Sequence, residues 1–170
     1  MAMDIPLKPS SDIDLETSFV DDEELLYRSI SYTKLKDYIQ QTNDGIAISS
    51  QAFSDRWLKP SVDRAVLNNN DPSKTQINPR DGIVSLLTSK IRKIDEVKRQ
   101  SQDGENLTVY EIDVVHRPTP TNFAHAQIEP SPELETKDKN IFRKLTRSLA
   151  FLATQRIREY GWEIDPYKDL

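Results

Sequence analysis

The chain has no cysteine, only four glycines and no long uninterrupted apolar run. Without cysteine it cannot form disulfides, thiolate zinc sites or a cysteine nucleophile, and such a composition fits a reducing cytoplasm. No two glycines lie close together, so neither a Walker loop nor a dinucleotide-binding fingerprint can be built, and no Gly-x-Ser-x-Gly nucleophile elbow occurs. No stretch is long and apolar enough to cross a bilayer. We therefore expect a cytoplasmic protein that does not enter a membrane.

Charge is unevenly distributed along the 170 residues, which are 36% hydrophobic and 30% charged. The net charge is −5, but residues 1–24 alone carry −7, so the remainder carries about +2. Acidic, proline-bearing segments without periodicity are typical of solvated, mobile chain. We therefore expect a disordered acidic leader over residues 1–22 and a single domain over residues 23–170. The leader could alternatively shield a basic patch or contact a partner.

The clearest strand signal covers residues 107–115, where Tyr110, Ile112 and Val114 alternate with polar neighbours. A second alternating segment covers residues 123–129. Two prolines lie between the segments, and proline cannot donate to a strand ladder. The pattern predicts two neighbouring antiparallel strands that are joined by a long, proline-bearing loop.

Other segments supply further elements. Short apolar runs predict strands over residues 24–30 and 83–87, and a helix capped by Ser31 or Thr33 should end at residues 43–45. Apolar residues at three-to-four spacing predict a C-terminal helix within residues 133–160. Strands occur in adjacent pairs, which favours an α+β fold in which a mixed or antiparallel sheet packs against the C-terminal helix.

Both histidines, His116 and His125, lie close together in the sequence on either side of the two prolines. Imidazole titrates near neutral pH, so either ring could serve as a general base or a phosphate ligand. Arg117 and Asn122 could hold an anion or a cofactor beside them, since the arginine fork matches phosphate oxygens. Alternatively, His116 ends a strand and His125 is a satisfied polar group. Ligand number and spacing do not predict a metal site.

A second set of candidates centres on Gln127 and Glu129, which point to the same side of a strand. With Arg28 on an early strand and Ser49 and Ser50 on a later one, this order resembles the ADP-ribosyltransferases. The resemblance implies that Arg28 holds the phosphates of NAD and that Glu129 stabilises an oxocarbenium-like sugar cation. It implies that Ser49 or Ser50 supports Glu129 by hydrogen bonding. An exposed strand with a polar outer face is the alternative.

Four segments between residues 26 and 126 are also similar to small bacterial proteins of an uncharacterised family. They read Leu-Tyr-Arg, Ile-Ser-Ser-Gln-Ala-Phe, Pro-Ser-Val-Asp-Arg-Ala and Asn-Phe-Ala-His-Ala. This resemblance implies no established activity and no cofactor. We therefore expect an interaction or accessory module whose partner is another protein. The alternative is an NAD-dependent enzyme, which requires Arg28, Ser49 and Glu129 around one pocket.

The C-terminal helix is basic, with seven bases and two acids between residues 137 and 159. Such a face can contact phosphates, receive the acidic leader or simply be solvated. No helix-turn-helix or aromatic RNA-binding pattern accompanies it. We therefore do not expect nucleic acid as the partner.

Overall fold

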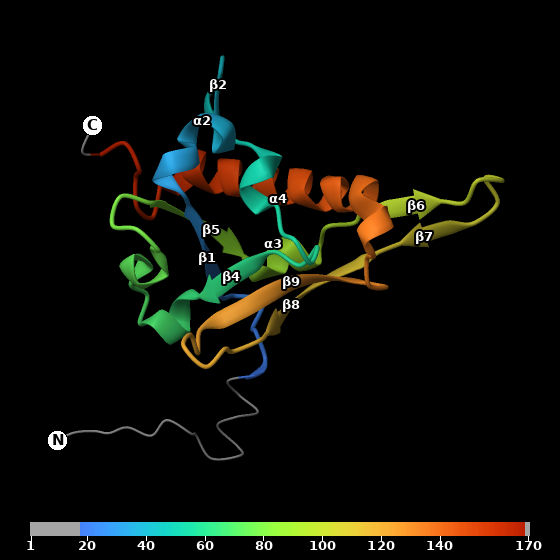
Figure 1. Ribbon diagram of the computed structural model, residues 1–170, viewed down its shortest axis with the longest axis horizontal. Coiled ribbons are helices and arrows are strands. Elements are labelled where there is room, and N and C mark those ends of the chain that lie inside the picture. Colours follow the sequence, from blue (N-terminus) through green and yellow to red (C-terminus); the bar gives the residue numbers. More distant parts are fainter. Residues whose placement is uncertain (1–17, 169–170) are drawn as a thin grey trace.

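The computed structural model describes residues 18–168, and its main element is a five-stranded antiparallel sheet (Figure 1). The strands lie in the spatial order β5-β1-β4-β9-β8, and each neighbouring pair is antiparallel. They are β1 (Leu25–Ile30), β4 (Ser61–Arg64), β5 (Gly82–Leu87), β8 (Glu111–His116) and β9 (His125–Ser131). The predicted α+β class is confirmed.

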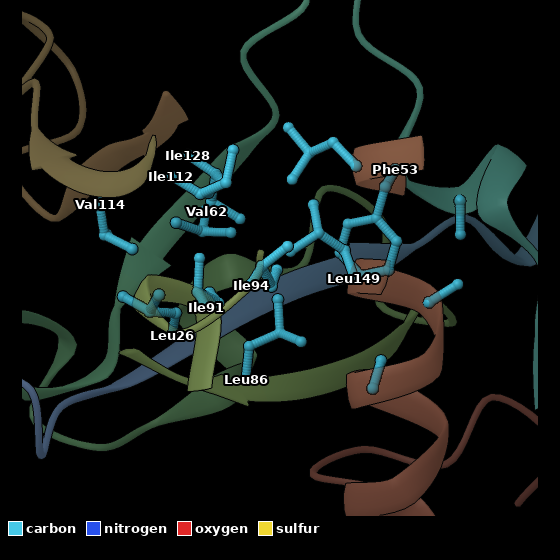
Figure 2. Packing of buried hydrophobic residues seen from close by; sticks show 14 of the residues in the cluster. Leu26, Phe53, Val62, Leu86, Ile91, Ile94, Ile112, Val114, Ile128 and Leu149 are labelled. Atoms are coloured by element: carbon cyan, nitrogen blue, oxygen red, sulfur yellow. The ribbon is translucent and has the colours of Figure 1, made fainter. Parts of the chain in front are cut away.

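The long helix α4 (Lys139–Tyr160) packs against one face of the sheet. Figure 2 shows side chains from several strands, from α3 (Thr88–Arg92) and from α4 meeting in one apolar layer. Leu149 on α4 and Phe53 are fully buried there. Both the existence of this helix and its apolar face were predicted from its periodicity. None of the described helices has the length and apolar character that crossing a bilayer requires.

The predicted hairpin is confirmed: β8 and β9 pair from Glu111↔Ser131 to His116↔Ala126. The predicted strand 107–115 is however divided at Tyr110. Its first part, β7 (Leu107–Val109), pairs with β6 (Lys98–Gln100), whereas the second part is β8. The amide of Tyr110 donates to the carbonyl of Val97, which extends the β6–β7 pairing by one residue before β8 begins in the five-stranded sheet.

The helix predicted to end at residues 43–45 is only one turn long, α2 (Leu35–Tyr38). The chain then forms the hairpin of β2 (Ile39–Thr42) and β3 (Gly45–Ile48). The residues that we interpreted as a helix stop are the hairpin turn, where Gly45 has φ +108°. Asp-Gly is a typical hairpin-turn signal, so the turn was recognised but attributed to the wrong element.

Short 3₁₀ helices occupy Tyr32–Lys34, Ser50–Phe53, Ala65–Asn68, Pro72–Thr75 and Thr136–Asp138.

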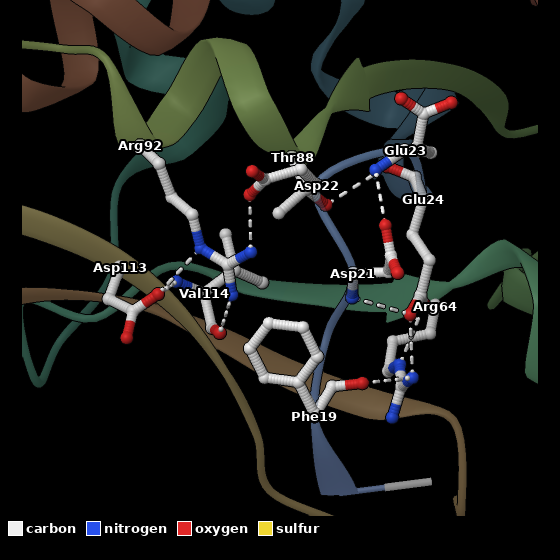
Figure 3. Close-up of polar contacts among 10 residues, drawn as sticks. All are labelled: Phe19, Asp21, Asp22, Glu23, Glu24, Arg64, Thr88, Arg92, Asp113 and Val114. Atoms are coloured by element: carbon white, nitrogen blue, oxygen red, sulfur yellow. Dashed lines mark hydrogen bonds and ion pairs between the residues drawn. The ribbon is translucent and has the colours of Figure 1, made fainter. Parts of the chain in front are cut away.

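Part of the expected leader belongs to the folded structure, while residues 1–17 lie outside the described residues. Val20 is 1% exposed, and Asp22 pairs with Arg92. Glu24 makes a bidentate ion pair with Arg64, in which each carboxylate oxygen of Glu24 lies 2.8 Å from a guanidinium nitrogen (Figure 3). Two acids of this run, Asp22 and Glu24, are therefore counter-ions for arginines of the domain.

We expect replacement of Leu149 by alanine to lower the free energy of unfolding by about 2–5 kcal/mol, because it leaves a cavity at the centre of the core. The matched control is Phe151→Ala on the same helix, which removes a side chain that is 60% exposed. We expect the control to change stability by less than about 1 kcal/mol. Urea denaturation followed by circular dichroism measures both, and equal losses would contradict the observed packing.

Candidate functional site

The sheet opens between β1 and β4. These strands share only two residue pairs, Leu26↔Arg64 and Tyr27↔Asp63. On its other edge β1 continues pairing with β5 through all six of its residues. The end of β1 therefore separates from β4, and a cleft of about 550 Å³ lies at this point. Its volume is in the range of small-molecule sites.

Arg28 bridges the opening between the two strands. Its Nη1 donates to the carbonyl of Ser61 on β4 at 2.8 Å. Its Nε and Nη2 donate to the carbonyl of Ala52 at 3.1 and 2.9 Å, and Nη2 also reaches Ser54. Burial lowers the pKa of Arg28 from its ordinary value, with a smaller opposing effect of Asp55. Arginine nevertheless stays charged in proteins, so the cleft contains a fixed cation whose hydrogen bonds within residues 18–168 go to neutral carbonyls.

Two buried carboxylates line the same cleft. Asp63 is 7% exposed and accepts from Asn122 at 2.8 Å and from Thr75 at 2.8 Å, with a longer contact from Asn68. Asp81 is 3% exposed and accepts from two backbone amides and one serine hydroxyl. Neither carboxylate takes part in an ion pair with any residue that the structure describes. The cleft therefore holds two carboxylates against one cation.

Tyrosines complete the lining of the cleft: Tyr27, Tyr32 and Tyr38. Burial raises the pKa of Tyr27, and the carboxylates of Glu163 and Asp71 raise it further. Its hydroxyl therefore stays protonated at neutral pH and can donate a hydrogen bond. Aromatic side chains with one polar end suit a ligand that has both apolar and polar surface.

The two histidines lie on opposite faces of the sheet. His116 pairs directly with Ala126, so it shares the face of that residue, whereas His125 precedes Ala126 on β9 and points the other way. His125 lines the cleft, where its Nδ1 lies 2.7 Å from the carbonyl oxygen of Arg117 and its Nε2 lies 3.1 Å from Ser61 Oγ. The structure therefore separates the two imidazoles and brings only His125 into the cleft.

His116 has an apolar environment instead. Its ring meets Phe123 edge-on with centroids 5.2 Å apart, and neither ring nitrogen has a hydrogen-bond partner within the described chain. Burial lowers the pKa of His116, and the positive charge of Arg64 lowers it further, while Glu24 opposes the shift. The neutral imidazole is therefore the form that the fold favours.

The residues of the transferase resemblance do not meet. Arg28 lines the cleft, but Ser49 is buried and accepts from the amide of Gln51 at the start of a 3₁₀ helix, with Ser50 beside it. Glu129 lies on β9 in a bidentate pair with Arg117, at 2.8 and 3.0 Å. Gln127 and Glu129 are two residues apart on β9 and therefore point to the same face of the sheet. Neither side chain lines the cleft. Arg28, Ser49 and Glu129 therefore do not surround one pocket.

The four segments that carry the other resemblance do converge. They contribute to the cleft Tyr27 and Arg28, then Ala52, then Ser61 to Asp63, and finally Asn122 and His125. Sequence reasoning singled out Arg28, Asn122 and His125 but missed Asp81, which follows a polar loop and gave no signal other than its place before a strand. Within residues 18–168, no three histidine, aspartate or glutamate side chains are grouped to hold a metal ion.

Comparison with protein-family models, with curated proteins and with solved structures finds no significant match for this chain. The function is therefore inferred from the geometry of the cleft.

We expect His116 to make the fold sensitive to acid. Because its pKa is lowered in the folded state, its stabilising contribution is complete above the unfolded pKa of about 6.5 and is lost as the pH falls through the folded value. His116→Phe should therefore lose less stability than the parent chain between about pH 8 and about pH 5. Urea midpoints of both proteins at the two pH values measure this, and parallel losses would show that His116 does not titrate on unfolding.

Proposed function

We propose that the protein is an accessory module that binds a small polar molecule carrying an ammonium group in the cleft between β1 and β4. The observation that carries this proposal is the pair of buried carboxylates, Asp63 and Asp81, neither of which forms an ion pair with a described residue, while the one cation of the cleft, Arg28, donates to backbone carbonyls. Burying an uncompensated charge is costly, and a cationic ligand group removes that cost.

The hydrogen-bonding pattern supports the same ligand chemistry. Among residues 18–168, Asp63 Oδ1 accepts from Asn122 alone and Asp81 Oδ1 from the amide of Tyr32 alone, which leaves each oxygen able to accept from a ligand. Arg28 Nη1 carries two N–H groups and uses one for Ser61. A ligand with an ammonium group at one end and a hydrogen-bond acceptor at the other would satisfy the remaining acceptors of Asp63 and Asp81 and the remaining N–H donor of Arg28.

We expect amines, amino acids and amino sugars to raise the melting temperature, while their neutral or anionic analogues do not. A ligand at about 100 times its Kd should give a rise of about 5–10 °C for a chain of this size. Asp63→Asn should abolish the rise because it removes the charge while keeping the shape. Glu133→Gln is the matched control, since it removes a carboxylate that is 68% exposed and pairs with Lys59 outside the cleft.

Two results would contradict the proposal. One is that no amine shifts the melting temperature at concentrations up to several millimolar. The other is a shift by NAD with release of nicotinamide that is lost in Glu129→Gln, which would favour the transferase alternative. The cytoplasmic location and the similarity to small bacterial proteins stay predictions.

A second candidate function is protein docking along α4. Two adjoining pockets of about 500 and 400 Å³ share Ser50 and run between this helix and the segment that precedes β4. Their lining includes five bases and one acid: Arg56, Lys139, Arg143, Arg147, Arg158 and Asp55. Among the described ion pairs none involves Lys139, Arg143 or Arg147.

We propose that this groove receives an acidic polypeptide segment with large apolar side chains. The charge of the groove is complementary to carboxylates. Its apolar lining residues, Leu58, Phe142 and Phe151, suit hydrophobic anchors better than they suit a sugar-phosphate backbone. Phe151 is 60% exposed and therefore accessible to such an anchor.

Fluorescence anisotropy with a labelled peptide of alternating glutamate and leucine tests this candidate. We expect the double variant Arg143→Glu, Arg147→Glu to weaken binding at least about tenfold, because it reverses two charges of the groove. Lys93→Glu, an exposed reversal outside the groove, should leave binding unchanged. A glutamine-for-glutamate peptide that binds equally well, or a single-stranded RNA that binds more tightly, would refute the acidic-peptide assignment.

A further inference from the structure

The cleft contains a serine and a histidine in the arrangement of an activated nucleophile. Ser61 Oγ lies 3.1 Å from His125 Nε2, within hydrogen-bond reach. Both residues line the cleft. They come from neighbouring strands, where Asp63 is opposite His125 and Ser61 is opposite Gln127. The two side chains are therefore diagonal neighbours on one face of the sheet.

A backbone carbonyl fixes the proton on this imidazole. His125 Nδ1 lies 2.7 Å from the carbonyl oxygen of Arg117, and a carbonyl can only accept a hydrogen bond. In the neutral ring Nδ1 therefore carries the hydrogen, and Nε2 presents a lone pair to Ser61. Ser61 is thus the nucleophile, His125 is the base, and the carbonyl of Arg117 orients the base in the position that a carboxylate often takes.

Two charged residues adjoin this pair. Arg28 Nη1 donates to the backbone carbonyl of Ser61 itself, so a fixed positive charge lies at the backbone of the serine. Asp63 lies directly opposite His125 in the strand pairing. An ammonium group held by Asp63 would therefore lie next to the serine–histidine pair.

We propose that Ser61 and His125 catalyse acyl transfer from small esters that carry an ammonium group. This proposal rests on the binding function proposed for the same cleft. Ser61 Oγ attacks the ester carbonyl carbon while His125 Nε2 takes its proton. The tetrahedral intermediate collapses with cleavage of the bond to the alcohol oxygen, and His125 returns the proton to the departing alcohol. Water then adds to the acyl-serine with His125 again as the base, which releases the carboxylic acid and restores the serine.

Covalent labelling tests the nucleophile directly. We expect diisopropyl fluorophosphate to form an adduct at Ser61, with loss of fluoride, that peptide mass spectrometry locates. His125→Gln should slow labelling at least about a hundredfold, because it removes the base and keeps a polar side chain. Ser148→Ala, on α4 and outside the cleft, should label like the parent chain. Hydrolysis of an amino-acid methyl ester, followed by acid release, should be lost in both Ser61→Ala and His125→Gln.

Thermal shifts with the corresponding free amino acid separate this proposal from the binding function. A shift that persists in Ser61→Ala, with no adduct and no hydrolysis in the parent chain, would overturn the acyl-transfer proposal and leave the binding function standing. Labelling that maps to another serine, or that is equally fast in His125→Gln, would also overturn it. Absence of any thermal shift in the parent chain would overturn the binding function and, with it, the acyl-transfer proposal that rests on it.

Discussion

The separation of β1 from β4 is the constraint on which the rest of the site depends. After two residue pairs the strands part, and carbonyl groups that a continuous ladder would satisfy have no strand partner. Arg28 meets this need at the carbonyl of Ser61 on β4, and its other donors bind the carbonyls of Ala52 and Ser54 in the segment before β4. The guanidinium therefore keeps the sheet intact around an opening that would otherwise expose unsatisfied backbone to the core. The opening is thus a stable part of the fold.

The same separation explains why polar groups from distant parts of the sequence meet. Asp63 lies at the last shared pair of the two strands, so its side chain is held at the inner end of the cleft. Asn122 reaches it from the loop of the β8–β9 hairpin, and Thr75 reaches it from the segment before β5. Each neutral donor stabilises the carboxylate without cancelling its charge. A buried charge retained in this way is typical of binding and catalytic sites.

Much of the fold could be predicted from the sequence because it depends on local patterns. The alternation through Ile112 and Val114, the two prolines of the loop and the periodicity of α4 identified the hairpin and the helix. The site was only partly predictable, because it depends on strand register. Register places Glu129 beside Arg117 and separates it from Arg28, and it turns His116 and His125 to opposite faces. No local pattern encodes where two strands part, so the cleft and Asp81 could not be found in advance.

The acidic run at residues 21–24 limits how far the N-terminus can be shortened before the domain loses stability. A chain that started at Leu25 would leave Arg64, whose side chain is 3% exposed, without the carboxylate of Glu24. It would also remove Val20 from the core and one of the two carboxylates that hold Arg92. A buried guanidinium without its carboxylate partner is strongly destabilising. Composition alone would place the cut after residue 22, inside this run, whereas the contacts of Arg64 with Glu24 and with the carbonyl of Phe19 require that a minimal fragment begin no later than Phe19.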